Sequence, residues 1–561
     1  MRNSLPFRLP RALARPCLAT ALFSLLALPA PAQERASSAP PTAPRSARPT
    51  ASAPTPPPVP REFRGVWVAA VANIDWPSRP GLSTWEQQRE LRAILDRAAA
   101  LHLNAVILHV RPAADALYPS AREPWSEYLT GQQGVGPEPA WDPLATAVRE
   151  AHARGLELHA WFNPYRAMHP SGKTSDTALT HVSRASPSLV RTYGTHLWMD
   201  PGDPAVRRQS LGVVLDVVRR YDVDGVHIDD YFYPYKERDA AGQVIDFPDS
   251  ATYARYRARG GTLGRDDWRR HNVDEYVREL YAGVKAAKPW VRVGISPFGI
   301  WRPGTPADVK GFDAYQEIYA DSRKWLRNGW LDYLAPQLYW PVNAEGQRFT
   351  SLLGFWTREN VHHRHLWPGL YTSRSAGLGG RGSWPTAEVL EQVRLTRANP
   401  GSTGNIHFSM KGLMPAPGQR IVAGAGPEPW PDTLAARLLA GPYAEAALPP
   451  ASPWLDRAPV ATPRVRFARD SATGGTRVHF APRGDGVVRW WTVQSLGPDG
   501  WETLILPGDA RTHLVTRRAG DTPPRAIWVR AVDRVGKESR AVVLEPRRRG
   551  SRWSAEPEVA P

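Results

Sequence analysis

The stretch DGVHIDDYFYP, residues 224–234, decides how the rest of the chain is interpreted. An apolar run ends there in two adjacent carboxylates, Asp229 and Asp230, followed by aromatic residues and a proline. Parallel α/β folds carry their catalytic side chains at such strand ends. Because neighbouring strand residues point to opposite faces, one carboxylate is expected to point into the centre and the other to lie sideways. An acidic turn closing a strand is the plainer interpretation.

Strands and amphipathic helices alternate on both sides of this stretch. The first helix is predicted to begin at the capping box Ser83–Glu86. Eight predicted strands with interleaved helices indicate a (β/α)8 TIM-type barrel over residues 61–445. An open doubly wound sheet is the alternative, but no glycine-rich phosphate loop follows the first strand. Besides the opening stretch, the predicted strands are 64–71, 105–110, 156–162, 291–295, 333–338, 366–371 and 405–410.

The two ends of the chain differ from the predicted barrel in composition and sequence pattern. Residues 1–32 resemble a secretory signal, because arginines precede an apolar run that is too short to span a bilayer stably. The single cysteine, Cys17, lies inside this signal, where the preceding proline argues against lipid anchoring. Residues 33–60 indicate a Pro/Ala/Ser-rich disordered linker. After a linker at 446–460, seven short alternating runs in 461–547 predict a small all-β sandwich, and 548–561 is expected to be a basic disordered tail.

Composition narrows the possible partners. The formal net charge of +17 favours an anionic partner. The arginines are scattered and accompany no nucleic-acid-binding motif, so we expect no nucleic acid partner. With 23 tryptophans and 18 tyrosines, whose flat rings stack on sugars, an acidic polysaccharide in the periplasm or outside the cell fits better. The sequence makes no prediction of oligomeric state.

Polar and aromatic residues end the predicted strands, where a barrel carries its active site. Glycosidic bond cleavage needs one carboxylate to attack or to activate water and a second acid to protonate the leaving oxygen. Asp229 and Asp230 are central catalytic candidates, and Glu317, Asp321 and Glu123 are further candidates for the acid. Zinc-hydrolase and serine-hydrolase motifs are missing, so we expect neither metal nor cofactor. The predicted substrate-binding residues are Trp67, Asn73, Asp75, Arg111, Asp115, Asn163, Tyr165, Arg166, His227, Tyr231, Trp301, Gln337, Tyr339 and Trp340.

The predicted barrel contains the motifs RGVW (64–67), NIDWPS (73–78), HVRPAADALYPS (109–120), EPWSEYLTG (123–131), ELHAWFNPYR (157–166), DGVHIDDYFYP (224–234), ISPFGIWR (295–302), YADSRKWL (319–326) and DYLAPQLYW (332–340). This series, between residues 61 and 440, resembles the family 10-like glycoside hydrolases of bacterial envelopes. The resemblance implies a barrel that acts on peptidoglycan glycan strands, favouring strands without stem peptides. Peptide-free muramic acid exposes a lactyl carboxylate, which arginines can bind. Residues 461–547 are similar to a fibronectin type III domain, in particular IWVRAVDRVGKES at 527–539.

The opening stretch also resembles the nucleophile strand of the alpha-amylase clan. That alignment puts Asp229 at the nucleophile position and His227 in place of an arginine. No glutamate ends the fifth or sixth predicted strand, where that clan has its acid. Two functions therefore stay open: an exported hydrolase of cell-wall glycan, and a non-catalytic glycan-binding protein of the envelope built on a degenerate barrel.

Overall fold

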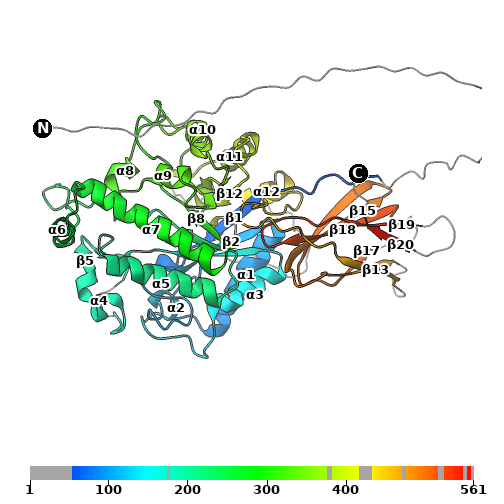
Figure 1. Ribbon diagram of the computed structural model, residues 1–561, viewed down its shortest axis with the longest axis horizontal. Helices are drawn as coiled ribbons and strands as arrows, with labels where there is room; N and C mark the ends of the chain where they lie inside the picture. The colour runs from blue at the N-terminus through cyan, green and yellow to red at the C-terminus, as the bar shows by residue number, and fades with distance from the viewer. Residues whose placement is uncertain are drawn as a thin grey trace, which may run out of the picture. The chain divides into compact units, whose positions relative to one another are not determined.

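A computed structural model of the chain describes residues 54–172, 177–375, 382–415, 433–470, 475–515, 524–546 and 553–557 (Figure 1). The predicted signal with Cys17 and the predicted linker up to residue 53 lie outside these ranges. We call residues 61–448 the α/β domain and residues 464–557 the β domain. Among the described residues, no helix combines the length and the apolar character needed to cross a bilayer.

A curled parallel sheet of nine strands forms the centre of the α/β domain, in the order β10-β9-β8-β7-β3-β2-β1-β12-β11. Strands β10 and β11 stand at opposite ends of this order, yet only residues 367 and 368 separate them in the chain. The two ends of the sheet therefore meet, and the predicted parallel α/β architecture is confirmed. The strands are β1 Phe63–Val68, β2 Ala105–Arg111, β3 Glu157–Phe162, β7 Gly225–Ile228, β8 Arg292–Ile295, β9 Tyr333–Leu334, β10 His365–Leu366, β11 Gly369–Leu370 and β12 Gly404–His407.

Helices follow the strands and pack on the outer face of the sheet through their apolar sides. The capping box Ser83–Glu86 begins α1 as predicted. Helices α5 and α7 lie side by side (Figure 1). The longer helices are α1 Thr84–Ala100, α3 Pro143–Ala153, α5 Pro204–Arg220, α6 Ser250–Ala258, α7 Arg265–Ala287, α10 Phe349–Glu359 and α11 Thr386–Ala398, and the shorter ones are α2 Glu127–Thr130, α4 Val182–Ala185, α8 Ala314–Glu317, α9 Ser322–Arg327 and α12 Leu434–Ala440.

A small antiparallel sheet that the sequence did not indicate follows β3. It consists of β4 Arg166–Met168, β5 Val190–Tyr193 and β6 His196–Met199, in the order β4-β6-β5. Residues 173–176 of this connection are outside the described ranges. Because β4 begins only four residues after β3 ends, the small sheet starts beside the carboxyl end of the parallel sheet.

Aromatic and histidine side chains fill the inside of the curled sheet, in a cluster that includes Trp67, Trp161 and Tyr333. The Trp67 indole donates to His227 Nε2 at 3.0 Å, and the Tyr333 hydroxyl lies 3.0 Å from His227 Nδ1. Burial holds the pKa of His227 well below its usual range. Trp67 and His227 were predicted to touch substrate, but both are buried in this interior, where they contact each other.

The β domain contains two antiparallel sheets, β13-β14-β17 and β16-β15-β18-β19-β20, which confirms the predicted all-β character. Apolar side chains of the two sheets, among them Val478, Trp491 and Val529, form a common core. Within residues 548–561, which the sequence predicts to be a disordered tail, Trp553–Pro557 forms β20 and pairs with β19. The strands are β13 Arg464–Arg469, β14 Thr476–Ala481, β15 Val488–Gly497, β16 Gly500–Pro507, β17 Thr512–Val515, β18 Ala526–Asp533, β19 Val542–Pro546 and β20 Trp553–Pro557.

Buried polar contacts join the β domain to the amino ends of the parallel strands. Arg489 Nε donates to Asp224 Oδ1 at 3.2 Å, just before β7 begins. Asp224 also accepts a hydrogen bond from the backbone of Leu158 at 2.8 Å. The Trp490 indole donates to the Gly155 carbonyl at 2.7 Å. These contacts are at the opposite end of the strands from Asp229.

Candidate active site

Asp229 lies at the carboxyl end of β7 and points into the curled sheet. Ile228 packs in the outer core, so the alternation of strand side chains turns His227 and Asp229 inward. The carboxylate is only 4% exposed. Its Oδ2 accepts hydrogen bonds from the Trp161 indole at 3.1 Å and from the Asn163 amide, and its Oδ1 accepts one from the Tyr231 backbone at 3.3 Å. Three fixed donors therefore hold this carboxylate in one orientation.

Asp230 is equally buried and leans toward the neighbouring strands β8 and β9. Its Oδ1 accepts a hydrogen bond from Gln337 Nε2 at 2.9 Å, and its Oδ2 accepts one from the Tyr235 hydroxyl. Gln337 Nε2 also donates to the Ser296 carbonyl at 3.0 Å, which fixes the direction of the amide. The predicted division into an inward and a sideways carboxylate agrees with these contacts.

The two carboxylates titrate as a pair. Burial, followed by the negative charge of Asp230, raises the pKa of Asp229 to about 7. Burial also raises the pKa of Asp230 above its usual value. Arg166 opposes both shifts, but the burial of the carboxylates outweighs it. Such a pair shares one proton near neutral pH, which general acid catalysis requires.

Asn163 connects this pair to the surrounding cations. Its Oδ1 accepts a hydrogen bond from Arg166 Nη2 and lies 3.0 Å from His109 Nε2, so its NH₂ group must face Asp229. Arg166 Nε donates to the Pro112 carbonyl at 2.9 Å, and its guanidinium lies 5.0 Å from the centre of the Tyr231 ring. The predicted residues Asn163, Arg166 and Tyr231 thus adjoin the catalytic candidates.

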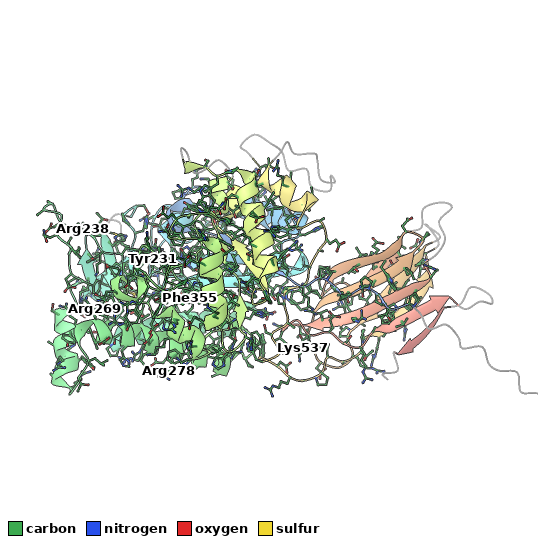
Figure 2. The ribbon with its side chains drawn as sticks, turned by 90° about the horizontal axis from the view of Figure 1, so that it is seen from above. Tyr231, Arg238, Arg269, Arg278, Phe355 and Lys537 are labelled. Atoms are coloured by element: carbon green, nitrogen blue, oxygen red, sulfur yellow. The ribbon has the colours of Figure 1, made fainter. Side chains whose placement is uncertain are left out.

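Partly exposed aromatic rings surround the carboxylates. Figure 2 shows Tyr231 inside the α/β domain, and its ring centre is 5.7 Å from that of Tyr235. Tyr339 packs 5.1 Å from Tyr371, and Trp340 packs 5.5 Å from Phe298. Half-buried rings beside an acidic pair form a surface on which sugar rings can stack. Gln337, Tyr339 and Trp340, predicted from the β9 segment, all belong to these surroundings.

Several predicted residues contact other groups instead. Arg111 forms a two-point ion pair with Glu123 whose side chains are 0% and 2% exposed. Arg111 also donates to the Asn163 carbonyl, so it helps to fix the backbone next to Asp229. Asp115 accepts from the Ala113 backbone at 3.0 Å and is fully buried.

The predicted residues near β1 and Tyr165 also have packing contacts. Asp75 accepts hydrogen bonds from the Ala69 backbone, from the Ser409 hydroxyl at 2.8 Å and from the Lys411 backbone at 2.7 Å. Asn73 donates to the carbonyls of Pro77 and Tyr128, both at 2.9 Å. Tyr165 is buried in the outer core against Tyr276. These side chains shape the loops around the site.

Glu317 and Asp321, predicted as candidate acids, lie in the connection between β8 and β9. Glu317 pairs with Lys236 at 2.9 Å, and its side chain is 35% exposed. Asp321 caps the start of α9 and accepts a hydrogen bond from the Trp301 indole at 3.0 Å. Neither makes a hydrogen bond to Asp229 or Asp230.

Sequence reasoning missed Trp161 and Tyr235, which contact the acidic pair, and Arg374, which packs against Tyr371 and Trp384. Trp161 precedes Asn163 by two positions and so faces inward with it, a signal that strand alternation supplied. Tyr235 follows the acidic pair on a loop, where no periodicity indicates direction. Arg374 lies 5.7 Å from the Tyr371 ring centre and 5.6 Å from that of Trp384.

Within the described ranges, no three His, Cys, Asp or Glu side chains are grouped so that they could hold a metal ion. The donors around Asp229 are nitrogen hydrogens, which stabilise a carboxylate but cannot ligate a cation.

Two proteins of known name are similar to this chain in sequence. The chain is 40% identical to "Glycosyl hydrolase YngK" of Bacillus subtilis (strain 168) over 497 residues, which cover 86% of this chain and 92% of that protein. It is 37% identical to "Glycosyl hydrolase DigH" of Escherichia coli (strain K12) over 313 residues, 52% of this chain and 69% of that one.

Solved structures give weaker likenesses. An endo-beta-1,4-mannanase from Thermotoga petrophila has a TM-score of 0.41 at 10% identity, covering 86% of this chain and 97% of that one. The PgaB (BpsB) glycoside hydrolase domain from Bordetella bronchiseptica has a TM-score of 0.39 at 15% identity, covering 63% and 94%. The family model described as "Glycosyl hydrolase-like 10" matches residues 62–375, which include both carboxylates and most of the surrounding rings. The chain therefore belongs to the glycosyl hydrolase-like 10 family.

Proposed function

We propose that this chain is an exported glycoside hydrolase that cleaves glycosidic bonds in cell-wall glycan, namely peptidoglycan strands lacking stem peptides. The observation that carries the proposal is the buried pair Asp229 and Asp230, with raised pKa values, among partly exposed aromatic rings. In the same proposal, the α/β domain is a (β/α)8 TIM-type barrel, the β domain is fibronectin type III-like, and residues 1–32 direct export.

A partly exposed arginine supports an anionic sugar as the substrate. Arg374 packs against the rings of Tyr371 and Trp384 and is only partly buried. A guanidinium beside a ring that stacks on a sugar can pair with a carboxylate on the same sugar. The lactyl group of muramic acid supplies such a carboxylate when no stem peptide is attached, so peptide-free strands suit these residues better than peptide-bearing ones.

A non-catalytic glycan-binding protein is the second candidate. The observation that favours it is which residues occupy the inward-facing positions at the ends of β8 and β9. These positions hold Ser296 and Gln337, which carry no acid. In this alternative the rings and arginines bind glycan while Asp229 and Asp230 serve only in hydrogen bonding.

One assay separates the two candidates. The purified chain is incubated with peptide-free and with peptide-bearing peptidoglycan, and soluble glycan fragments are measured together with binding of the protein to the insoluble material. We expect fragments mainly from peptide-free strands, and at least about a 10³-fold loss in Asp229→Asn and Asp230→Asn. Glu391→Gln, on the exposed face of α11, is the matched control. Binding without any release would establish the second candidate, and loss of release with a chelator would require a metal.

A further inference from the structure

We propose that Asp229 and Asp230 cleave the glycan by making the substrate's own 2-acetamido group the nucleophile. The inference rests on the proposed function, because both sugars of peptidoglycan carry that group. Asp229 accepts a hydrogen bond from the acetamide N–H and orients the amide, while Asp230 protonates the leaving oxygen. The two acids thus share one reaction step, and neither forms a covalent bond to the sugar.

The first argument is the placement of the two acids. Glycosidases that use one acid and one nucleophile or base set two carboxylates on either side of the scissile bond. Here the two buried acids are consecutive residues at the end of a single strand, β7. Gln337 donates to Asp230, and the Ser296 hydroxyl lies 3.0 Å from His227 Nε2, so neither neighbouring strand end supplies a second acid. A nucleophile brought by the substrate completes this arrangement.

The second argument is the chemistry of the hydrogen-bond partners, which gives each acid a different role. Asp229 faces the Trp161 indole, the Asn163 amide and the Tyr231 backbone, all of which can only donate as they are oriented. Such partners favour the ionised carboxylate. Three donors leave one of its four lone-pair positions open, which the acetamide N–H can fill.

Asp230 has a hydrogen-bond partner that can act either as donor or as acceptor. The Tyr235 hydroxyl donates to the ionised carboxylate and can accept from the protonated one. When the acetamide N–H adds a fourth donor to Asp229, the proton that the free site holds on Asp229 moves to Asp230, which lies sideways of the inward-facing Asp229. A proton donor to the glycosidic oxygen is needed at that lateral position.

The reaction then balances in two steps. The acetamide carbonyl oxygen forms a bond to C1 as the C1–O bond to the leaving sugar breaks, and the leaving oxygen takes the proton of Asp230. The resulting oxazolinium ion keeps its N–H on ionised Asp229. Water then attacks C1 and gives a proton to Asp230, and the C1–O bond of the oxazolinium breaks to restore the acetamide. The configuration at C1 is retained.

The test changes only the acyl group of the substrate. Peptide-free strands are de-N-acetylated, and portions are re-acylated with acetyl or trifluoroacetyl groups. Trifluoroacetylation keeps the nitrogen uncharged but makes the carbonyl oxygen a poor nucleophile. We expect the re-acetylated strands to be cleaved like the untreated ones, and the trifluoroacetylated strands to be cleaved at least about 10³-fold more slowly, given the effective molarity of an intramolecular nucleophile. Binding of each material to the protein is measured in parallel and is expected to change little between the two acylated forms.

Two further readouts complete the experiment. Proton NMR of the first product is expected to show retained configuration at C1. Tyr235→Phe, which removes the hydroxyl partner of Asp230, is expected to move the alkaline limb of the pH–rate profile while Asp229 keeps its three donors. Equal cleavage of trifluoroacetylated strands, an inverted product, or a sugar covalently trapped on Asp229 would each overturn the inference. Failure to cleave even untreated strands would instead refute the proposed function, and the inference with it.

Discussion

The buried ion pair between Arg111 and Glu123 gives a sharp prediction for Glu123→Gln. The substitution keeps the shape of the side chain but removes its charge, and it turns an NH₂ group toward the Arg111 guanidinium. Arg111 is 0% exposed, so its cation stays buried without a counter-ion. Breaking a buried pair from one side costs about 3–5 kcal/mol of unfolding free energy.

That cost converts into a measurable melting shift. Unfolding entropy of about 2.1 cal/mol/K per residue gives roughly 0.8 kcal/mol/K for a unit of about 390 residues, the size of the α/β domain. The expected decrease in Tm is therefore about 4–6 °C, measured by circular dichroism at pH 7. Activity measured well below Tm is expected to fall by about tenfold or less, through the Arg111 contact to the Asn163 carbonyl.

Two controls make this result interpretable. Glu391→Gln removes one partner of an exposed pair with Arg394, whose side chains are 41% and 63% exposed, and we expect its Tm to stay within about 1 °C. Glu123→Leu combined with Arg111→Met removes both charges and is expected to recover much of the lost stability. An unchanged Tm together with a loss of activity of about 10³-fold would refute the reasoning, because Glu123 would then be the proton donor.

Four other substitutions test the remaining contacts. Glu317→Gln and Asp321→Asn are each expected to keep activity within about threefold of the wild type. Glu317 pairs with Lys236, and Asn replaces Asp321 well as a helix cap. A loss of activity of about 10²-fold in either variant would identify a catalytic acid. Asp229→Asn is expected to raise Tm at pH 8 but not at pH 4. The folded pKa of Asp229 is about 7 and its ordinary value is 3.8, so the stability of the wild type falls as pH rises between these values. If the Tm difference between variant and wild type did not grow with pH, this reasoning would be contradicted. Arg489→Ala leaves Asp224 buried with weaker pairing and is expected to cost about 3–5 kcal/mol, whereas Arg466→Ala, on the exposed edge of β13, serves as its control.

Local sequence patterns predicted the directions of side chains well. Alternation along β7 indicated that one of Asp229 and Asp230 faces inward, and the contacts agree. The same rule applied to β3 would have found Trp161 from Asn163. The capping box at Ser83 marked the start of α1 because capping depends only on residues close in the chain.

The sequence did not predict how deep each inward-facing side chain lies inside the curled sheet. Trp67 and His227 stand near strand ends, yet they pack below the carboxylates, since depth depends on how neighbouring strands are staggered. Arg111 and Glu123 gave no sign that they would pair across a loop of eleven intervening residues. Tyr235 acquires its role from a loop conformation that no periodicity encodes.

The histidines packed inside the curled sheet limit the pH range in which this protein stays folded. Burial holds the pKa values of His109, His227 and His365 well below the ordinary value, and that of His407 at about 4. When the chain unfolds, these rings take up protons below about pH 6.5, so acid favours the unfolded state. At pH 5 each of these rings favours the unfolded state, and their contributions add against the total of about 5–15 kcal/mol that usually holds a domain folded. We therefore expect acid denaturation of the interior to end activity on the acidic side, while the proton shared by the two carboxylates is still in place.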